Sequence, residues 1–213
     1  MTSVPPDLSA GTYGYGTADL GFHHAYLLPA VERILARRGL SACRLLDLGC
    51  GNGSVAAHFA AQGYDVTGVD PSEDGIARGR QAYPEVALHV GSAYDDLAAA
   101  YGTFPVVLSL EVVEHLYDPH VFGHRLFDLV APGGIAVVST PYHGYLKNLA
   151  LALTGKMETH FNALWKHGHI KFFSVETLGR LLRQSGFGAI SFERVGRVPV
   201  LAKSMIAVAE RAS

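Results

Sequence analysis

The chain has 213 residues, with 17 basic and 19 acidic side chains and a net charge of -2, which suits one α/β domain over residues 1–213. The near balance of charge excludes a broad basic surface, so we expect no nucleic-acid partner. Because no apolar stretch reaches about 18 residues and residues 1–10 lack the blocks of a signal peptide, we expect a cytoplasmic protein, and peripheral contact with a membrane stays open.

Residues 1–40 are expected to form an N-terminal lid followed by the first helix. The first 20 residues are rich in proline and glycine and should form a loop, whereas apolar residues at three- and four-residue spacing predict a helix from about His23 to Gly39. The aromatic run Tyr13-Gly14-Tyr15, together with His23 and His24, could cover a pocket. An ordered strap without a part in catalysis is the alternative.

A glycine-rich run follows the first predicted strand, Leu45 to Leu48. Asp47, Gly49, Gly51 and Gly53 give the spacing D-x-G-x-G-x-G, and a helical pattern opens directly afterwards. Glycines between a strand and a helix let a ligand approach the backbone, so a nucleotide-like ligand is favoured. A glycine-rich turn in some unrelated α/β protein is the competing interpretation.

Strands and helices then alternate along the chain. Such alternation predicts an α/β fold with a parallel, doubly wound, Rossmann-like sheet and right-handed crossovers. The expected strands lie near 65–69, 86–90, 105–110, 135–139, 188–195 and 203–209, and the expected helices near 72–82, 94–100, 119–130 and 174–184.

An acidic residue, Asp70, ends the second predicted strand about 20 residues after the glycines, where a ribose-binding carboxylate would lie. A carboxylate can accept hydrogen bonds from both ribose hydroxyls. The alternative is that Asp70 caps the helix that begins after Pro71 and Ser72.

Two carboxylates and an imidazole follow the fourth predicted strand. Glu111, Glu114 and His115 have spacings that converge if the strand end turns helical. Such oxygen and nitrogen ligands suit Mg²⁺ or another divalent cation. Alternatively, Glu111 contacts a cofactor and the other two residues are structural.

Together these motifs resemble the class I S-adenosylmethionine (SAM) dependent methyltransferases over roughly residues 40–140. The resemblance rests on D-x-G-x-G-x-G, on Asp70, on the run Glu111-Val112-Val113-Glu114-His115 and on Pro132-Gly133-Gly134 before the fifth strand. The Glu111–His115 run is similar to that of the ubiquinone-biosynthesis O-methyltransferases. This resemblance implies a seven-stranded sheet whose last strand is antiparallel, and it implies that Glu111, Glu114 and His115 bind a divalent metal.

The resemblance also implies a set of SAM contacts. Backbone at Gly49 and Gly51 would lie against the amino-acid end of SAM, where a side chain would clash. Ser92 stands where the family often has an acid that reads the adenine, so recognition could pass to Ala93 or its neighbours, while Asp95 and Asp96 could cap the next helix. The full expected set is Asp47, Gly49, Cys50, Gly51, Asn52, Asp70, Pro71, Ser92, Ala93, Tyr94, Leu110 and Glu111.

Residues 141–170 form a connection longer than usual between a strand and a helix, which indicates a functional insertion or one with structure of its own. We expect it to cover a small apolar or aromatic acceptor. Core packing is the competing explanation for its aromatic residues. The expected acceptor contacts are Tyr142, Tyr145, Phe161 and Trp165.

The expected reaction transfers the SAM methyl group to a hydroxylated acceptor, whose proton must leave. A histidine near neutral pKa could take it, and His143 and His169 are the candidates, in an insertion that also holds His160 and His167. A bound metal could instead lower the pKa of the hydroxyl. A C- or N-methyltransferase of a lipid or secondary metabolite is the alternative, and a noncatalytic SAM-binding partner protein is the alternative from another class.

Overall fold

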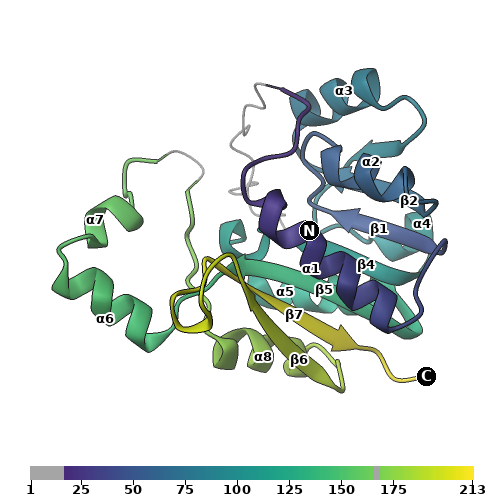
Figure 1. The fold of residues 1–213 in the computed structure, drawn as a ribbon. Helices are drawn as coiled ribbons and strands as arrows, with labels where there is room; N and C mark the ends of the chain where they lie inside the picture. Colours follow the sequence, from purple (N-terminus) through teal and green to yellow (C-terminus); the bar gives the residue numbers. More distant parts are fainter. Residues whose placement is uncertain (1–16, 166–167) are drawn as a thin grey trace, which may run out of the picture.

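A seven-stranded sheet with the order β3-β2-β1-β4-β5-β7-β6 organises the protein (Figure 1). This computed structural model describes residues 17–165 and 168–213. Strands β1 to β5 pair in parallel, whereas β7 runs antiparallel to both β5 and β6. The predicted fold class, including the antiparallel last strand, is therefore confirmed. The strands are β1 (Arg44–Leu48), β2 (Asp65–Asp70), β3 (Ala87–Val90), β4 (Phe104–Leu110), β5 (Val130–Pro141), β6 (Ile190–Val195) and β7 (Ser204–Glu210).

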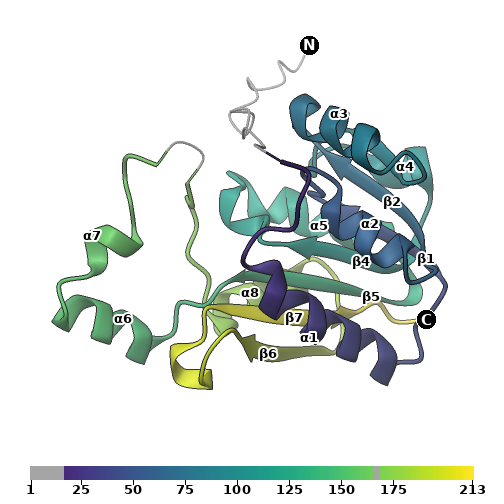
Figure 2. The same cartoon turned by 45° about the horizontal axis from the view of Figure 1, so that its top comes forward.

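Helices cover both faces of the sheet, as the two views show (Figures 1 and 2). Successive strand residues point to opposite faces, so Leu45 joins one buried cluster and Leu46 the other. The Leu45 cluster includes residues of α1 (His24–Arg37), α2 (Ser54–Ala60) and α3 (Glu73–Ala82). The Leu46 cluster includes residues of α4 (Leu97–Tyr101), α5 (Pro119–Leu129) and α8 (Val175–Gln184). This layering leaves the carboxyl edge of the parallel strands for ligands.

Short polar side chains start several helices at that edge. Ser72 accepts a hydrogen bond from Gly75 N at the start of α3, and Asp118 accepts from His120 N at the start of α5. Ser174 forms a capping box with Thr177 at the start of α8. These caps fix where each helix begins relative to the strand before it.

Strand β5 is longer than the predicted 135–139 and takes up the end of the predicted helix near 119–130. The difference has a local cause, because the backbone of Val130 pairs with Phe104 and the backbone of Gly134 accepts a hydrogen bond from Arg211 N. Gly133 adopts a φ of 76°, which favours glycine, and its N–H donates to Arg211 O. These pairings extend the sheet through Pro132-Gly133-Gly134, which sequence reasoning placed before the strand.

The 141–170 insertion holds two helices, α6 (Tyr145–Leu153) and α7 (Met157–His160), that project beside the sheet (Figures 1 and 2). We call residues 144–165 the arm. None of the residues of α6 is buried. The chain returns through residues 168–173, where the N–H groups of Ile170 and Lys171 donate to Glu114 O in the short helix η1 (Val113–His115). Within the described residues, no helix is both long enough and apolar enough to cross a membrane.

Candidate functional site

The glycine loop between β1 and α2 depends on backbone conformations that favour glycine. Gly49, Gly51 and Gly53 have φ angles of 85°, 56° and 74°. A Cβ atom on Gly49 would also collide with the side chain of Val112. The N–H groups of Gly49 and Cys50 both donate to Val69 O, at 2.8 and 3.1 Å, and so anchor the loop to β2. The loop is thus held open toward the carboxyl edge of the sheet.

Asp70 connects the glycine loop to the start of α3. Its Oδ2 accepts a hydrogen bond from Gly51 N at 2.9 Å, and its Oδ1 accepts from Ser72 N at 2.8 Å. Burial raises the pKa of this carboxyl, and the two N–H donors oppose the rise. Each oxygen retains acceptor capacity, so a structural role and a ribose-binding role are compatible. Pro71, the next predicted contact, is exposed.

Asp47 lies almost fully buried behind the loop, and its Oδ2 has no hydrogen-bond partner among the described residues. Burial, together with the nearby Asp70 charge, raises the pKa of Asp47 to about 7. Burial likewise raises the pKa of the neighbouring Cys50 thiol, so Cys50 is a buried neutral group. A buried carboxyl group with a strongly raised pKa beside a glycine loop is typical of a ligand-binding site.

The end of the N-terminal segment lies against the glycine loop. Asn52 Nδ2 donates to Thr17 O at 2.9 Å and to Asp19 O at 3.1 Å, while the Tyr83 hydroxyl donates to Ala18 O at 2.7 Å. The rings of His23 and His24 follow, with centroids 4.0 Å apart. The predicted lid residues Tyr13 to Tyr15 lie outside the described residues.

The turn after β3 is held by Asp95. Its Oδ2 accepts from Ser92 N at 2.7 Å, and the Ser92 hydroxyl accepts from Tyr94 N at 3.2 Å. Asp96, not Asp95, caps α4 through Ala99 N. Ala93 is buried, and the Tyr94 hydroxyl accepts from Asp118 N. These contacts shape the place where the adenine was expected.

Glu111 follows Leu110 at the end of β4 with a φ of 57°, a strained conformation for a side chain of this size. Ser139 stabilises it: the Ser139 hydroxyl donates to Glu111 Oε1 at 2.8 Å, and Glu111 N donates to Ser139 O at 3.1 Å. Burial raises the pKa of Glu111 to about 7. Strained residues of this kind concentrate at functional sites.

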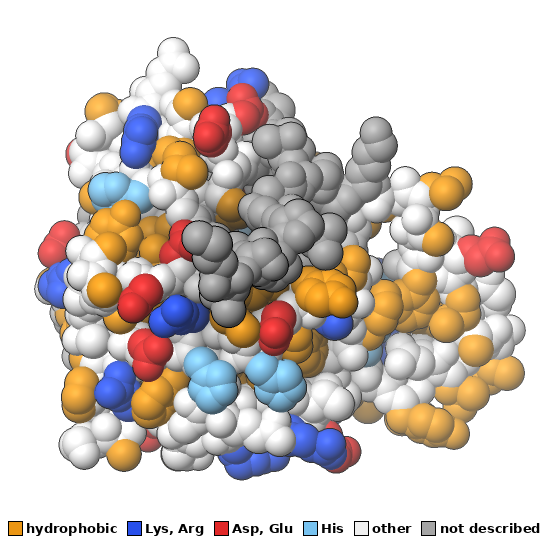
Figure 3. All heavy atoms as spheres, turned by 180° about the vertical axis from the view of Figure 1, so that it is seen from behind, with side chains coloured by type: hydrophobic (Ala, Val, Ile, Leu, Met, Phe, Trp, Pro, Cys, Tyr) orange, Lys and Arg blue, Asp and Glu red, His pale blue; other side chains and the backbone are white. Residues whose placement is uncertain are grey.

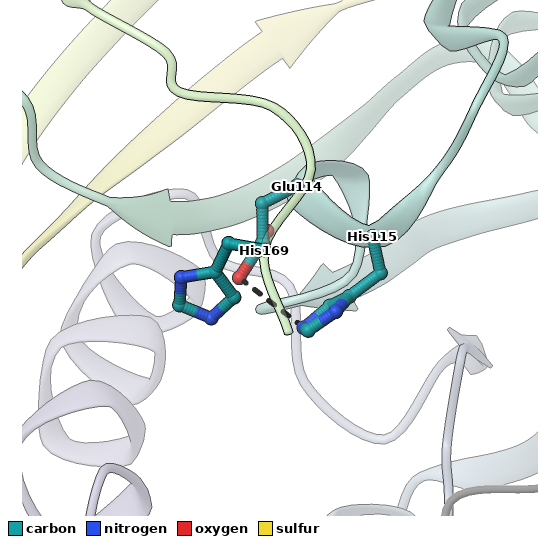
Figure 4. Close-up of side chains that lie close together, drawn as sticks. All are labelled: Glu114, His115 and His169. Atoms are coloured by element: carbon teal, nitrogen blue, oxygen red, sulfur yellow. Dashed lines mark ion pairs between the residues drawn. The ribbon is translucent and has the colours of Figure 1, made fainter. Parts of the chain in front are cut away.

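Glu114, His115 and His169 form a group that could hold a metal ion, since one ligand atom from each lies within 4.8 Å of the other two. Figure 4 shows the three side chains converging from η1 and from the returning segment. Glu114 is 1% exposed, neither of its carboxylate oxygens has a hydrogen-bond partner among the described residues, and Oε1 lies 4.0 Å from His115 Nε2. Glu111 is not part of this group, and its Oε1 accepts a hydrogen bond from the Ser139 hydroxyl instead. Of the predicted trio, the structure thus brings Glu114 and His115 together, and it adds His169 to them.

His143 lies at the end of β5 in an aromatic cluster. Its ring centroid is 5.5 Å from that of His160, 5.4 Å from Phe161 and 5.2 Å from Phe172. Burial, with the nearby Lys147 charge, lowers the pKa of His143 to about 4, and its Nδ1 has no hydrogen-bond partner among the described residues. Burial and His115 likewise lower the pKa of His169 to about 4. Both imidazoles are therefore neutral at pH 7 and able to accept a hydrogen bond.

The four predicted acceptor residues fall into different places. Phe161 stacks on His143, and the Trp165 ring lies 5.5 Å from that of His169. Tyr142 is buried in the core, with Arg194 over its ring. Tyr145 is 79% exposed on α6. The structure thus brings Phe161 and Trp165 to the histidines and leaves Tyr142 and Tyr145 outside that cluster.

Several residues at this edge escaped sequence reasoning. Ser139 supports Glu111, Ser204 Oγ lies 3.2 Å from the Tyr26 hydroxyl, and Lys147 Nζ donates to Tyr142 O at 2.8 Å. A signal existed for Ser139, a polar residue at the end of an otherwise apolar strand. Tyr26 and Ser204 gave none, because they come together only through the fold.

Comparison with known proteins agrees with this geometry. A family model described as "Methyltransferase domain" matches residues 21–191, so the chain belongs to this family, that of the SAM-dependent methyltransferases.

Among curated relatives, a ubiquinone biosynthesis O-methyltransferase of Caulobacter sp. (strain K31) is 42% identical over 123 residues, which cover 56% of this chain and 48% of that protein. Another of the same name, from Aromatoleum aromaticum, is 32% identical over 70% of this chain and 65% of its own length. The chain spans about half the length of the first of these relatives.

Solved structures show the fold. Magnesium protoporphyrin IX methyltransferase from Synechocystis PCC 6803, with bound S-adenosylhomocysteine (SAH), aligns with a TM-score of 0.68 at 19% identity, covering 94% of this chain and 91% of that one. A SAM-dependent methyltransferase from Mesorhizobium loti aligns with a TM-score of 0.66 at 22% identity, covering 86% and 96%.

Proposed function

We propose that the chain transfers the methyl group of SAM to an oxygen atom of a small, apolar or aromatic, hydroxylated acceptor, and that residues 1–213 act as one domain. The observation that carries this proposal is the hydrogen bond from Gly51 N to Asp70 Oδ2, which joins the glycine loop to the acid of the next strand. Names of the curated relatives support the choice of oxygen.

In this proposal the SAM methionyl group lies along the backbone of Gly49 to Gly53, and the ribose lies at Asp70. Ser92, Ala93 and Tyr94 border the adenine, while Leu110 and Glu111 close the pocket from β4. SAM supplies an activated methyl group on its sulfonium, so the protein must align the acceptor and manage its proton. The O–CH₃ bond forms as the S–CH₃ bond breaks, and the hydroxyl proton leaves the acceptor.

His143 is proposed to accept that proton or to orient the hydroxyl, and His169 is the second candidate when it holds no metal ion. Their neutral rings can accept a hydrogen bond at pH 7, but a pKa of about 4 makes each a weak base. Help in lowering the pKa of the hydroxyl would therefore raise the rate.

A cation held by Glu114, His115 and His169 would lower the pKa of the acceptor hydroxyl. We propose this group as the site of Mg²⁺ or another divalent cation. A buried carboxyl group without a hydrogen-bond partner among the described residues, together with two imidazoles, suits Mn²⁺ or Zn²⁺ better than Mg²⁺, which prefers oxygen ligands. A bound divalent cation supplies Lewis acidity that lowers the pKa of a hydroxyl. Calorimetry with Mn²⁺ should show binding to the wild type and none to His169→Ala, and a chelator should depress turnover. Full turnover in metal-stripped protein would refute the metal part.

Peripheral membrane contact and a cytoplasmic location belong to the same proposal. The arm exposes apolar side chains, and hydrophobic atoms gather over it in Figure 3. They include Tyr145, Leu146, Leu149, Leu153 and Met157. Cys43 and Cys50 are both free, as expected in a reducing compartment.

The test is turnover with labelled SAM and a panel of catechols, amines and activated-carbon acceptors. We expect the label on oxygen of a catechol-type product. Transfer only to nitrogen or carbon would favour the alternative methyltransferase, and SAM binding without any transfer would favour a noncatalytic SAM-binding partner.

A further inference from the structure

A cavity of about 370 Å³ lies apart from the glycine loop, where α6 and α7 face the loop between β6 and β7 that contains η2 (Pro199–Leu201). This volume is in the range of small-ligand sites. Its described lining includes no Asp or Glu. The lining side chains that matter are Lys147, Arg197, Lys203 and His160, with Leu151 and Leu201 as apolar walls.

The three cations differ in what they offer a ligand. Lys147 Nζ donates to Tyr142 O at 2.8 Å and to Ala202 O at 3.2 Å, so it contributes charge more than free donors. Lys203 Nζ lies over the Tyr26 ring, 5.3 Å from its centroid. The exposed Arg197 guanidinium has no hydrogen bond or ion pair with any described residue.

Arg197 is therefore the open donor of this cavity. A guanidinium presents paired N–H groups that match the oxygens of a carboxylate or phosphate. The cations also repel one another: burial and the Arg197 charge lower the pKa of Lys147. A bound anion would relieve this repulsion.

We propose that the cavity binds the carboxylate or phosphate of an amphipathic ligand, with Arg197 as the donor and with Leu151 and Leu201 against the apolar part. The cavity adjoins the reaction site, because His160 lines it and its ring lies 5.5 Å from that of His143. A ligand that extends from Arg197 past His160 would approach His143. The identification of this ligand with the methyl acceptor rests on the proposed function; the binding itself does not.

The experiment is calorimetric titration of the full chain with octyl phosphate, octanol and inorganic phosphate. Arg197→Gln should weaken octyl phosphate binding by about tenfold or more, and Arg197→Lys should restore part of it, since a lysine keeps the charge without the paired donors. Octanol binding should not change. Arg33→Gln is the matched control, because Arg33 is also exposed and lies on α1 outside the cavity.

Equal octyl phosphate binding by wild type and Arg197→Gln would overturn the proposal, and so would octanol binding as tightly as octyl phosphate. Inorganic phosphate should bind more weakly than octyl phosphate, and equal affinity would exclude an amphipathic ligand. These tests measure binding and not turnover. A protein that passes them but transfers no methyl group would refute the proposed function and leave the cavity proposal standing. Where turnover is measurable, octyl phosphate should raise the KM for the acceptor without changing kcat. An unchanged KM would show that the acceptor does not bind in this cavity.

Discussion

The corner around Gly51 and Asp70 and the arm, residues 144–165, are built in opposite ways. At the corner, Asp70 accepts two backbone hydrogen bonds and lies 8% exposed. On the arm, α6 buries none of its residues. The comparison indicates that the corner proposed to hold SAM is fixed by the fold itself, whereas the part proposed to meet the acceptor is loosely held.

The histidine between the two regions should show the largest effect. His143→Ala should lower kcat about 10²–10⁴-fold, because it removes the group that accepts the proton of the hydroxyl or orients that hydroxyl. Since the pKa of His143 is lowered to about 4, the imidazole protonates, and the wild-type rate falls for that reason, only as the pH drops toward this value. Steady-state kinetics from pH 4 to 9 measure this.

His169→Ala serves as the second test and His124→Ala, an exposed histidine on α5, as the control. Near wild-type kcat in both His143→Ala and His169→Ala would move proton removal to another group or to the acidity of the acceptor.

A substitution inside the corner comes next. Gly49→Ala should reduce the free energy of unfolding by about 2–4 kcal/mol, through both backbone strain and displacement of Val112. Gly63 has a similar φ of 89°, but no atom lies within 4 Å of the place its Cβ would take, so Gly63→Ala should cost only about 1–2 kcal/mol of strain. Urea unfolding measures both, and equal losses would show that close packing at Gly49 is unimportant.

Substitution of the buried Asp47 at the same corner should have a smaller effect on the free energy of unfolding, and it should stabilise the protein. The pKa of Asp47 is raised from 3.8 to about 7, so the wild type loses stability as the pH rises between these values. Asp47→Asn lacks that loss and should be about 1–3 kcal/mol more stable than wild type at pH 8, with little difference at pH 4. Melting curves at the two pH values provide the check; a gain that is the same at both would exclude ionisation as the cause.

The arm should give the smallest effect on stability. Tyr145→Ala should change the free energy of unfolding by less than about 0.5 kcal/mol, because the side chain is 79% exposed.

Trp165→Ala, beside His169, should raise the KM for the acceptor more than it weakens SAM binding. Parallel losses for both ligands would place Trp165 in the cofactor pocket or the core.

The same contrast explains what could be predicted from the sequence. Asp47, Gly49 and Gly51 lie close together in the sequence and their spacing reflects local backbone geometry, so the loop could be predicted. The alternation of strands and helices predicted the parallel part of the sheet, and the family resemblance predicted its antiparallel last strand. The group formed by Glu114, His115 and His169 could not be predicted, because His169 is brought to η1 by long-range contacts, which include the hydrogen bonds of Ile170 and Lys171 to Glu114 O. Long-range contacts of this kind leave no spacing in the sequence.

The most direct test of the central claim is calorimetric titration of SAH into the wild type, Asp70→Ala and Asp65→Ala. Asp65 begins the same strand and is exposed, so Asp65→Ala controls for the loss of one carboxylate from β2. We predict that Asp70→Ala weakens SAH binding by roughly 1.5–3 kcal/mol while Asp65→Ala does not. Unchanged SAH affinity in a folded Asp70→Ala variant would contradict the assignment of the Gly51–Asp70 corner as the cofactor site.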